Sequence, residues 1–545
     1  MKKEQNPTGR DSAGDETFDY VIVGAGSAGC VLANRLSASG RHSVLLLEAG
    51  PKDTNLWIHV PLGYGKLFKD GAVNWMYQTE PEPGLNGRSI FQPRGKVLGG
   101  SSSINGLVYV RGQHEDFERW RQCGNVGWGF DDVLPYFKKA EDQQRGADDF
   151  HGTGGPLTVS NPRQTDPLCE AFIAAAGETG IPANPDFNGA TQEGAGYFQT
   201  TTRRGRRAST AVAYLRPARG RRNLTVRTAT LAERILFENR RAVAVRYRQH
   251  GVERTAQARR EILVSAGAYN SPQLLQLSGI GPGDLLRGLA IDVVLDAGGV
   301  GHDLQDHLQV RMVMRCSRRI TINDAINHPL RRVWTGLRYA AFRTGPLTVA
   351  AGYAGAFFKT DPRLATPDIQ VHFIPFSADK MGEKLHSFSG FTASVCQLRP
   401  ESRGSLRIRS ADPTVPPEIR INYLATETDR TANVEGLKIL RRILHAPALQ
   451  PYVAGEVEPG AAIAGDEALL AYCRQSGSTI YHPASTCRMG LDPLAVVDQR
   501  LRVRGIDGLR VIDGSVMPDV VSGNTNAAII MIAEKASDLI LEDAR

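Results

Sequence analysis

Cysteine is scarce in this chain of 545 residues. There are seven cysteines, an odd number, and no two of them stand in C-x-x-C spacing. A disulfide scaffold or a zinc module needs cysteines in pairs at short intervals, so the sequence excludes both. The stretch before Phe18 is polar and shows no apolar segment of a secretory signal. We therefore expect a reduced, cytoplasmic protein in which residues 1–16 form a disordered tail.

Long apolar runs and a strong charge bias are also missing. The uncharged stretch at 344–358 is short and rich in glycine, whereas a membrane-spanning helix needs about 20 apolar residues. Lys and Arg number 65 against 57 Asp and Glu, a net charge of +8 that is mild for this length. The arginine clusters at 203–207 and 219–222 are typical of a solvated face and favour no nucleic-acid site. Attraction to an anionic membrane, as peripheral contact with an inner membrane, stays open.

What the sequence does contain is typical of a globular protein with a nucleotide-binding unit. Hydrophobic residues make up 41% and charged residues 22% of the chain, and the length suits two to four domains. The apolar run at 18–23 predicts a buried strand, 30–36 suits a helix, and 43–47 predicts a second strand. Together they form a β-α-β unit.

A glycine pattern stands at the centre of this unit. Gly24, Gly26 and Gly29 form G-x-G-x-x-G, with Ser27 and Ala28 between the last two, and Glu48 follows 19 residues after Gly29. The glycines allow a tight turn, close approach of a pyrophosphate and tight helix–strand packing. The pyrophosphate then meets the free N–H groups at the helix start. An acid at Glu48 accepts from a ribose hydroxyl and disfavours NADP, but the motif alone does not choose between NAD and FAD.

Five further segments carry a family resemblance. They are the segments 95–105 (GKVLGGSSSIN), 267–281, 300–307, 482–490 (HPASTCRMG) and 511–518. In this order they resemble signatures of the glucose–methanol–choline (GMC) oxidoreductases over nearly the whole chain. Within the family, the chain resembles the bacterial choline-dehydrogenase-like branch, which includes aliphatic alcohol, polyethylene glycol and sorbose dehydrogenases.

The resemblance implies an α/β (α+β) fold with two parts. A Rossmann-type FAD-binding domain would comprise 17–159, 203–315 and 478–545. A substrate-binding domain containing an antiparallel sheet would comprise 160–202 and 316–477.

The resemblance also implies FAD as cofactor. Besides the glycine loop and Glu48, the expected FAD-binding residues are Val97, Gly99, Gly100, Ser101, Asn105, Val108, Ala232, Asp513, Asn524 and Thr525. Some members of the family attach FAD covalently through a histidine. Ile104 stands at the matching position here, so we expect the cofactor to be bound non-covalently.

The catalytic pair implied by the resemblance is His482 and Asn526. Histidine suits the role of general base because its unperturbed pKa, about 6.5, lies near working pH. Asparagine cannot take a proton at neutral pH but can donate a hydrogen bond to the substrate oxygen. His302, Asp303, Asp306 and His307 lie close together in the sequence, but their spacing is loose, and we predict a structural or flavin-proximal turn and no metal site.

The expected substrate is a small molecule, a neutral aliphatic alcohol, sugar or polyol. Choline-type members carry a carboxylate that pairs with the substrate ammonium. Here the matching position is Tyr353, beside Ile480 and Tyr481 in the expected pocket, and no acid occurs at 343–359. The product would be an aldehyde or ketone, and the electron acceptor (quinone, dye or oxygen) stays open. The alternatives are an alcohol oxidase, a choline dehydrogenase, a family lyase with structural FAD and a non-catalytic nucleotide-binding protein.

Overall fold

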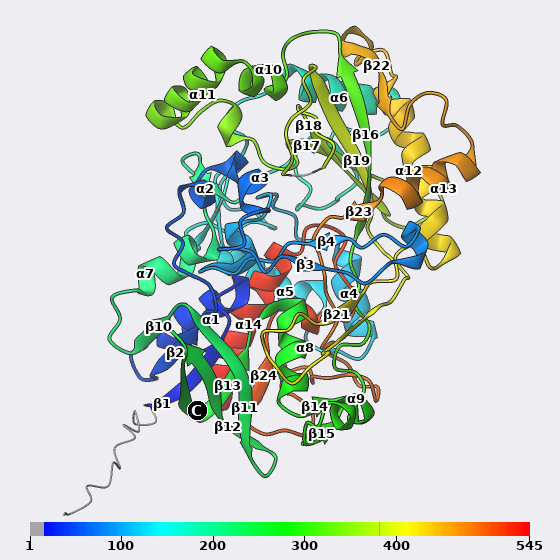
Figure 1. Cartoon of the computed structure of the whole chain (residues 1–545). Coiled ribbons are helices and arrows are strands. Elements are labelled where there is room, and N and C mark those ends of the chain that lie inside the picture. Colours follow the sequence, from blue (N-terminus) through cyan, green and yellow to red (C-terminus); the bar gives the residue numbers. More distant parts are fainter. Residues whose placement is uncertain (1–15, 381) are drawn as a thin grey trace, which may run out of the picture.

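The computed structural model describes residues 16–380 and 382–545, so the predicted tail lies outside the described residues except for Glu16. Two seven-stranded sheets lie toward opposite ends of the molecule, with loops and short elements between them (Figure 1). Each sheet has its own large apolar core.

The first sheet contains the predicted nucleotide-binding strands. Its order is β10-β2-β1-β13-β12-β11, with β24 also paired to β13. The strands β10, β2, β1, β13 and β24 run parallel, while β11, β12 and β13 form antiparallel hairpins. The bounds are β1 (Glu16–Val23), β2 (Val44–Leu47), β10 (Leu224–Arg227), β11 (Thr230–Glu238), β12 (Arg241–Gln249), β13 (Val252–Val264) and β24 (Leu509–Val511).

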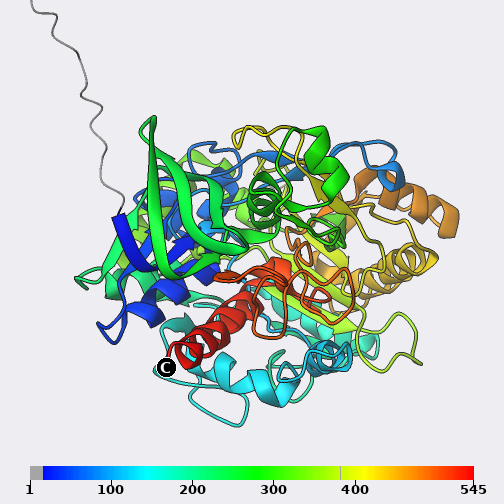
Figure 2. The ribbon, with the colours of Figure 1, turned by 90° about the horizontal axis from the view of Figure 1, so that it is seen from below.

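The helix that follows β1 is packed unusually close to the strand. Gly24 has φ +97°, which favours glycine, and a Cβ on Gly29 would stand 1.9 Å from the carbonyl oxygen of Gly24. Helix α14, red in Figure 2, packs against both α1 and α5, and α8 packs against β11. These helices are α1 (Ser27–Ser37), α5 (Phe130–Ala140), α8 (Gly267–Leu277) and α14 (Asn526–Asp543).

The second sheet is antiparallel throughout, as the resemblance implied. Its order is β22-β16-β19-β18-β17-β7, with β23 paired to β16. Helices α6 (Pro167–Glu178) and α12 (Glu427–Leu444) pack on this sheet. The strands are β7 (Gly194–Tyr197), β16 (Leu308–Cys316), β17 (Ala354–Phe358), β18 (Ile369–Ile374), β19 (Gly390–Gln397), β22 (Val453–Glu458) and β23 (Ser478–Thr479).

The other elements are short or peripheral. The helix pair α10 (Ile322–Asn327) and α11 (Pro329–Phe342) projects from the end of the molecule that holds the second sheet (Figure 1). The remaining α-helices are α2 (Leu56–His59), α3 (Tyr64–Leu67), α4 (His114–Gln122), α7 (Arg216–Ala218), α9 (Gly283–Gly288) and α13 (Asp466–Ser476). The remaining strands are β3 (Tyr77–Gln78), β4 (Phe91–Gln92), β5 (Glu141–Gln143), β6 (Leu157–Val159), β8 (Thr202–Arg203), β9 (Arg206–Arg207), β14 (Ile280–Gly281), β15 (Leu295–Asp296), β20 (Ser405–Arg407) and β21 (Glu418–Arg420).

The predicted fold class is confirmed: the chain combines a βαβ-based parallel sheet with a separate antiparallel sheet. The exact division into two domains stays a prediction. Nearly all of β16, as well as β23, falls in segments assigned to the first domain, yet both strands belong to the second sheet. No helix in the described part of the chain is both long enough and apolar enough to cross a bilayer.

Candidate active site

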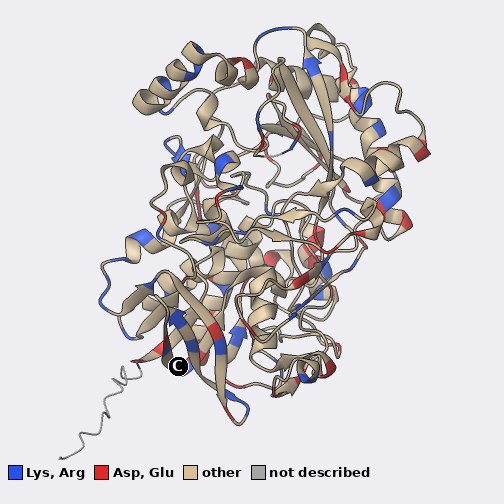
Figure 3. Ribbon diagram, viewed as in Figure 1, with Lys and Arg blue, Asp and Glu red and all other residues tan. Residues whose placement is uncertain are grey.

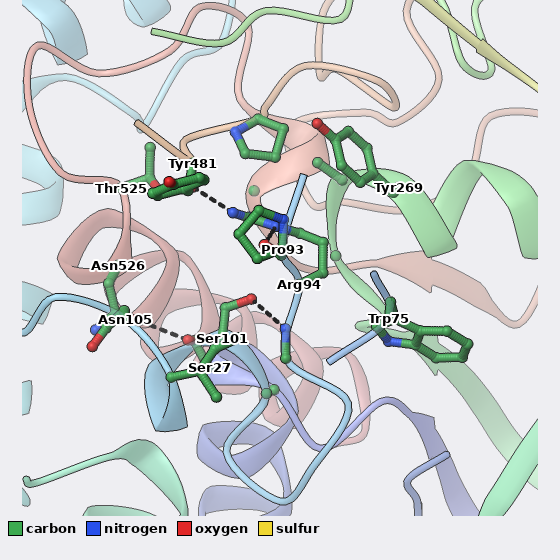
Figure 4. Close-up of a pocket in the computed structure, with 18 of the residues that line it drawn as sticks. Ser27, Trp75, Pro93, Arg94, Ser101, Asn105, Tyr269, Tyr481, Thr525 and Asn526 are labelled. Carbon is green, nitrogen blue, oxygen red and sulfur yellow. Dashed lines mark hydrogen bonds between the residues drawn. The ribbon is translucent and has the colours of Figure 1, made fainter. Parts of the chain in front are cut away.

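One deep cavity runs from the glycine loop of the first sheet to the inner face of the second sheet. Most of the predicted site residues line it: Gly24, Gly26, Ser27, Ala28, Glu48, Gly100, Ser101, Asn105, Val108, Ala232, Ile480, Tyr481, His482, Asp513, Asn524, Thr525 and Asn526. Figure 4 shows several of them converging from the two ends of the chain. Segments up to 500 residues apart in sequence therefore share one cavity.

The nucleotide end of the cavity is built from backbone. A Cβ on Gly100 would stand 2.6 Å from the Cα of Gly26, so the two glycine loops cross without side chains between them. Glu48 accepts hydrogen bonds from the N–H of Ala25 and of Gly50, both at 2.9 Å. Burial raises the pKa of the Glu48 carboxyl to about 7. A narrow groove in which two glycine loops approach each other closely beside the acid Glu48 fits a dinucleotide.

Asp513 fixes the far wall of this groove. Its carboxylate accepts from the N–H of Gly267 at 2.8 Å, from Ser271 Oγ at 2.5 Å and from the N–H of Ser515 at 2.8 Å. The carboxylate thereby joins the start of α8 to the turn after β24. The N-terminus of α14 opens into the same cavity, and Ser27 Oγ donates to Asn526 Oδ1 at 2.7 Å (Figure 4).

The proton acceptor of the site is defined by a chain of hydrogen bonds behind His482. His307 Nε2 lies 2.9 Å from the carbonyl oxygen of Leu398, so it must carry the proton. The Nδ1 atom of neutral His307 is then an acceptor, and it lies 3.0 Å from His482 Nδ1, which must donate. His482 Nε2 is left unprotonated, and Asn524 Nδ2 lies 3.1 Å from it. The chain thus presents a lone pair of His482 at the cavity.

Electrostatics keep His482 neutral. Burial, together with His307, His372 and Arg94 nearby, holds the pKa of His482 well below its usual range. A buried Asp306 fixes the loop by accepting from the His482 N–H at 2.7 Å. A neutral imidazole in a fixed tautomer is the state that a general base requires.

The structure places Asn524, not Asn526, within hydrogen-bond distance of His482, and both asparagines line the cavity. The role of Asn526 toward the substrate oxygen stays a prediction. The carboxamide beside His482 is that of Asn524, while Asn526 bonds to Ser27. Asn526 is the first residue of α14 and Asn524 precedes the cap, Thr525.

The inner face of the second sheet forms the opposite wall. Arg311 on β16 pairs in register with Ser394 on β19, which pairs with His372 on β18, and all three line the cavity. Burial lowers the pKa of His372 to about 4. Arg94 also lines this wall and donates to the carbonyl oxygen of Tyr481 at 2.8 Å (Figure 4).

Four predicted residues do not line the cavity: Gly29, Val97, Gly99 and Tyr353. Gly29 is packed under Gly24, Gly99 bonds through its N–H to the carbonyl oxygen of Ala25, and Val97 belongs to a small apolar cluster. The Tyr353 prediction is wrong as a pocket position. Its side chain is buried in the core of the second sheet, and its hydroxyl donates to the carbonyl oxygen of Gln164 at 2.5 Å.

Sequence reasoning missed the wall formed by Arg311, Ser394 and His372. A signal was present, because polar residues alternate with apolar ones in LQVRMVMRC at 308–316, as in a strand with one wetted face. In the sequence, His307 stands out only through its place in the 300–307 segment, which predicts a structural or flavin-proximal turn. Two side chains of that segment have separate partners. Asp303 forms an ion pair with Arg488, and His307 forms a hydrogen bond with His482.

The fold and this cavity define a dinucleotide-binding oxidoreductase, and comparison with known proteins narrows the class. Residues 18–309 and 400–533 match the two family profiles described as GMC oxidoreductase. The chain is 44% identical to mitochondrial choline dehydrogenase of Mus musculus over 538 residues, which cover 97% of this chain and 90% of that protein. It is also 44% identical to alcohol dehydrogenase [acceptor] of Pseudomonas putida over 527 residues, 96% of each chain.

A solved structure agrees with these relatives. Pyridoxine 4-oxidase from Mesorbium loti superposes with a TM-score of 0.87 at 32% identity, covering 95% of this chain and 98% of that one. The chain belongs to the GMC oxidoreductase family. It is an FAD-binding oxidoreductase that acts on CH–OH groups.

Proposed function

We propose that this protein is an FAD-dependent dehydrogenase that oxidises a neutral primary or secondary alcohol to an aldehyde or ketone. The observation that carries the proposal is the pair of nitrogens at the cavity, His482 Nε2 and Asn524 Nδ2, 3.1 Å apart. The relatives include both a choline dehydrogenase and an alcohol dehydrogenase. Family membership therefore does not decide the substrate, and the charge of the cavity is the evidence that bears on it.

In the proposed reaction each nitrogen has one role. His482 Nε2 accepts the hydroxyl proton, and Asn524 Nδ2 donates to the substrate oxygen, replacing the bond that it makes to His482 when no substrate is present. His307 Nδ1 accepts from the imidazolium that forms and keeps the ring oriented. FAD, when bound, supplies the acceptor for the hydride that leaves the carbinol carbon. We place the cofactor on Gly26, Ser27 and Glu48, held non-covalently because Ile104 cannot form a link.

The charge of the cavity favours a neutral substrate over choline. The only acids that line it are Glu48 and Asp513, within the described residues, and both already accept backbone hydrogen bonds at the nucleotide end. On the substrate side stand Arg94 and Arg311. A quaternary ammonium held about 6 Å from a guanidinium would be repelled by about 3 kcal/mol at an effective dielectric constant of 20.

The test compares choline with its uncharged isostere, 3,3-dimethylbutanol, by anaerobic reduction of the bound flavin. We expect the neutral alcohol to have a kcat/KM higher by about tenfold or more, equivalent to about 1.4 kcal/mol. A preference for choline would contradict the neutral-substrate proposal, and no bleaching by any alcohol would contradict redox catalysis itself. Mixing the reduced enzyme with oxygen and, separately, with a quinone distinguishes a dehydrogenase from an oxidase.

A further inference from the structure

Helix α11 carries an apolar stripe that points into solvent. Leu330, Val333, Trp334 and Leu337 are 77%, 60%, 65% and 59% exposed. They stand at i, i+3, i+4 and i+7, the spacing that places side chains on one face of a helix. Scattered exposed apolar residues are ordinary, but four on one stripe, followed by Phe342 at 70% exposure, mark an interaction surface.

The opposite face of α11 already holds the helix on the protein. Thr335 and Tyr339 are buried, and the Tyr339 hydroxyl donates to the carbonyl oxygen of Gly205 at 3.0 Å. The apolar stripe is therefore directed outward by the same contacts that fix the helix. Segment 1–15, outside the described residues, contains no apolar run that would cover the stripe.

The surroundings of the stripe are strongly basic. Residues 317–344 contain six arginines and one acid, Asp324. Arg331, Arg332 and Arg338 lie on α11 itself, and Figure 3 shows the basic positions along this projecting helix. An apolar face with Trp and Leu flanked by arginines is typical of helices that lie in the interfacial plane of a membrane. A second copy of this chain would bring like charges together, which disfavours self-association.

We propose that α11 docks the protein peripherally on a membrane that contains anionic lipid. The apolar stripe enters the boundary between headgroups and acyl chains, and the flanking arginines bind lipid phosphates. With 14 residues, α11 is suited to lie along the surface. The chain leads from α11 through residues 343–350 to Ala351, which lines the cavity.

The experiment uses the flavin-loaded full chain and vesicle flotation. The probes are vesicles of phosphatidylcholine with phosphatidylglycerol in equal parts, and vesicles of phosphatidylcholine alone. We expect binding to the anionic vesicles, weakened by salt, and a loss of about tenfold or more in the partition coefficient for the double variant Trp334→Glu/Leu337→Glu. Both side chains are exposed and lie outside the cavity, so activity toward a water-soluble alcohol should be unchanged.

The matched control is the double variant Val126→Glu/Leu491→Glu, which adds the same two charges at side chains that are 76% and 62% exposed elsewhere on the surface, and it should bind like the wild type. The proposal is overturned if the wild type does not float with anionic vesicles or if the double variant binds equally well. It is also overturned if analytical ultracentrifugation shows a wild-type dimer that the double variant dissociates, because α11 would then be an interface between copies.

Discussion

Replacing His307 by leucine tests whether the hydrogen bond behind His482 fixes the proton-accepting nitrogen. His307 is anchored by Leu398 and accepts from His482 Nδ1 at 3.0 Å. Leucine offers no acceptor, so the His482 ring loses the preference for the tautomer that presents Nε2 to the cavity. Once His482 takes the substrate proton, this hydrogen bond becomes charge-assisted, worth about 1.5–3 kcal/mol.

That free energy translates directly into a rate. At about 1.36 kcal/mol per factor of ten, flavin reduction by a saturating alcohol should slow about 10- to 100-fold in His307→Leu. The matched variant is His307→Asn, because asparagine Oδ1 can take the place of Nδ1 as acceptor, and it should recover most of the rate. The assay is anaerobic stopped-flow bleaching of the flavin, with flavin content checked by absorbance.

The pair of variants separates positioning from a merely structural role, because His307→Leu and His307→Asn both remove the imidazole but only His307→Asn keeps an acceptor. A His307→Leu variant that holds its full flavin content and whose flavin is reduced at the wild-type rate would refute the reasoning. So would a His307→Asn variant as slow as the leucine variant, since the acceptor would then be irrelevant.

Four further outcomes are expected. His482→Ala should keep the flavin spectrum and lower flavin reduction by about 10²-fold or more; a rate near that of the wild type would mean that another group is the base. Arg311→Glu should raise the kcat/KM ratio of choline to 3,3-dimethylbutanol by about tenfold, whereas Arg315→Glu, exposed on the same strand and away from the cavity, should leave the ratio unchanged. Because the pKa of His482 is lowered and the base is its neutral form, kcat/KM should rise with pH through a midpoint below 6.5 and then stay level; a midpoint above 6.5 would contradict the buried environment. Acid precipitation should release the flavin into solution, as Ile104 offers no link, and colour retained in the washed precipitate would indicate a covalent bond.

The sequence predicted those parts of the site that depend on local backbone. The glycine loop, Glu48 and the turn around Asp513 each follow a short strand, and a strand–turn pattern is visible in a window of a few residues. The helix at 525–543 was also predicted within one residue of α14. Such features depend on neighbours in the chain, which the sequence contains.

The parts that could not be predicted depend on the direction of side chains across long distances. The hydrogen bond between Asn524 and His482 joins residues 42 positions apart and depends on the path of the turn before α14, which no local pattern gives. Tyr353 was misplaced for a similar reason, since a shift of a residue in a strand moves a side chain to the other face of the sheet. The row Arg311–Ser394–His372 requires the register of three strands that are far apart in the chain.

Proton removal and substrate choice depend on different residues of this cavity. Proton removal depends on His307 and His482, which lie in loops at the ends of strands, whereas Arg311 and Ser394 sit on strands whose backbone pairing does not depend on their side chains. Exchanging these side chains can therefore change which alcohol is accepted without disturbing the tautomer of His482. In such an architecture new substrates can be acquired by single substitutions on the inner face of one sheet, while the redox chemistry stays intact.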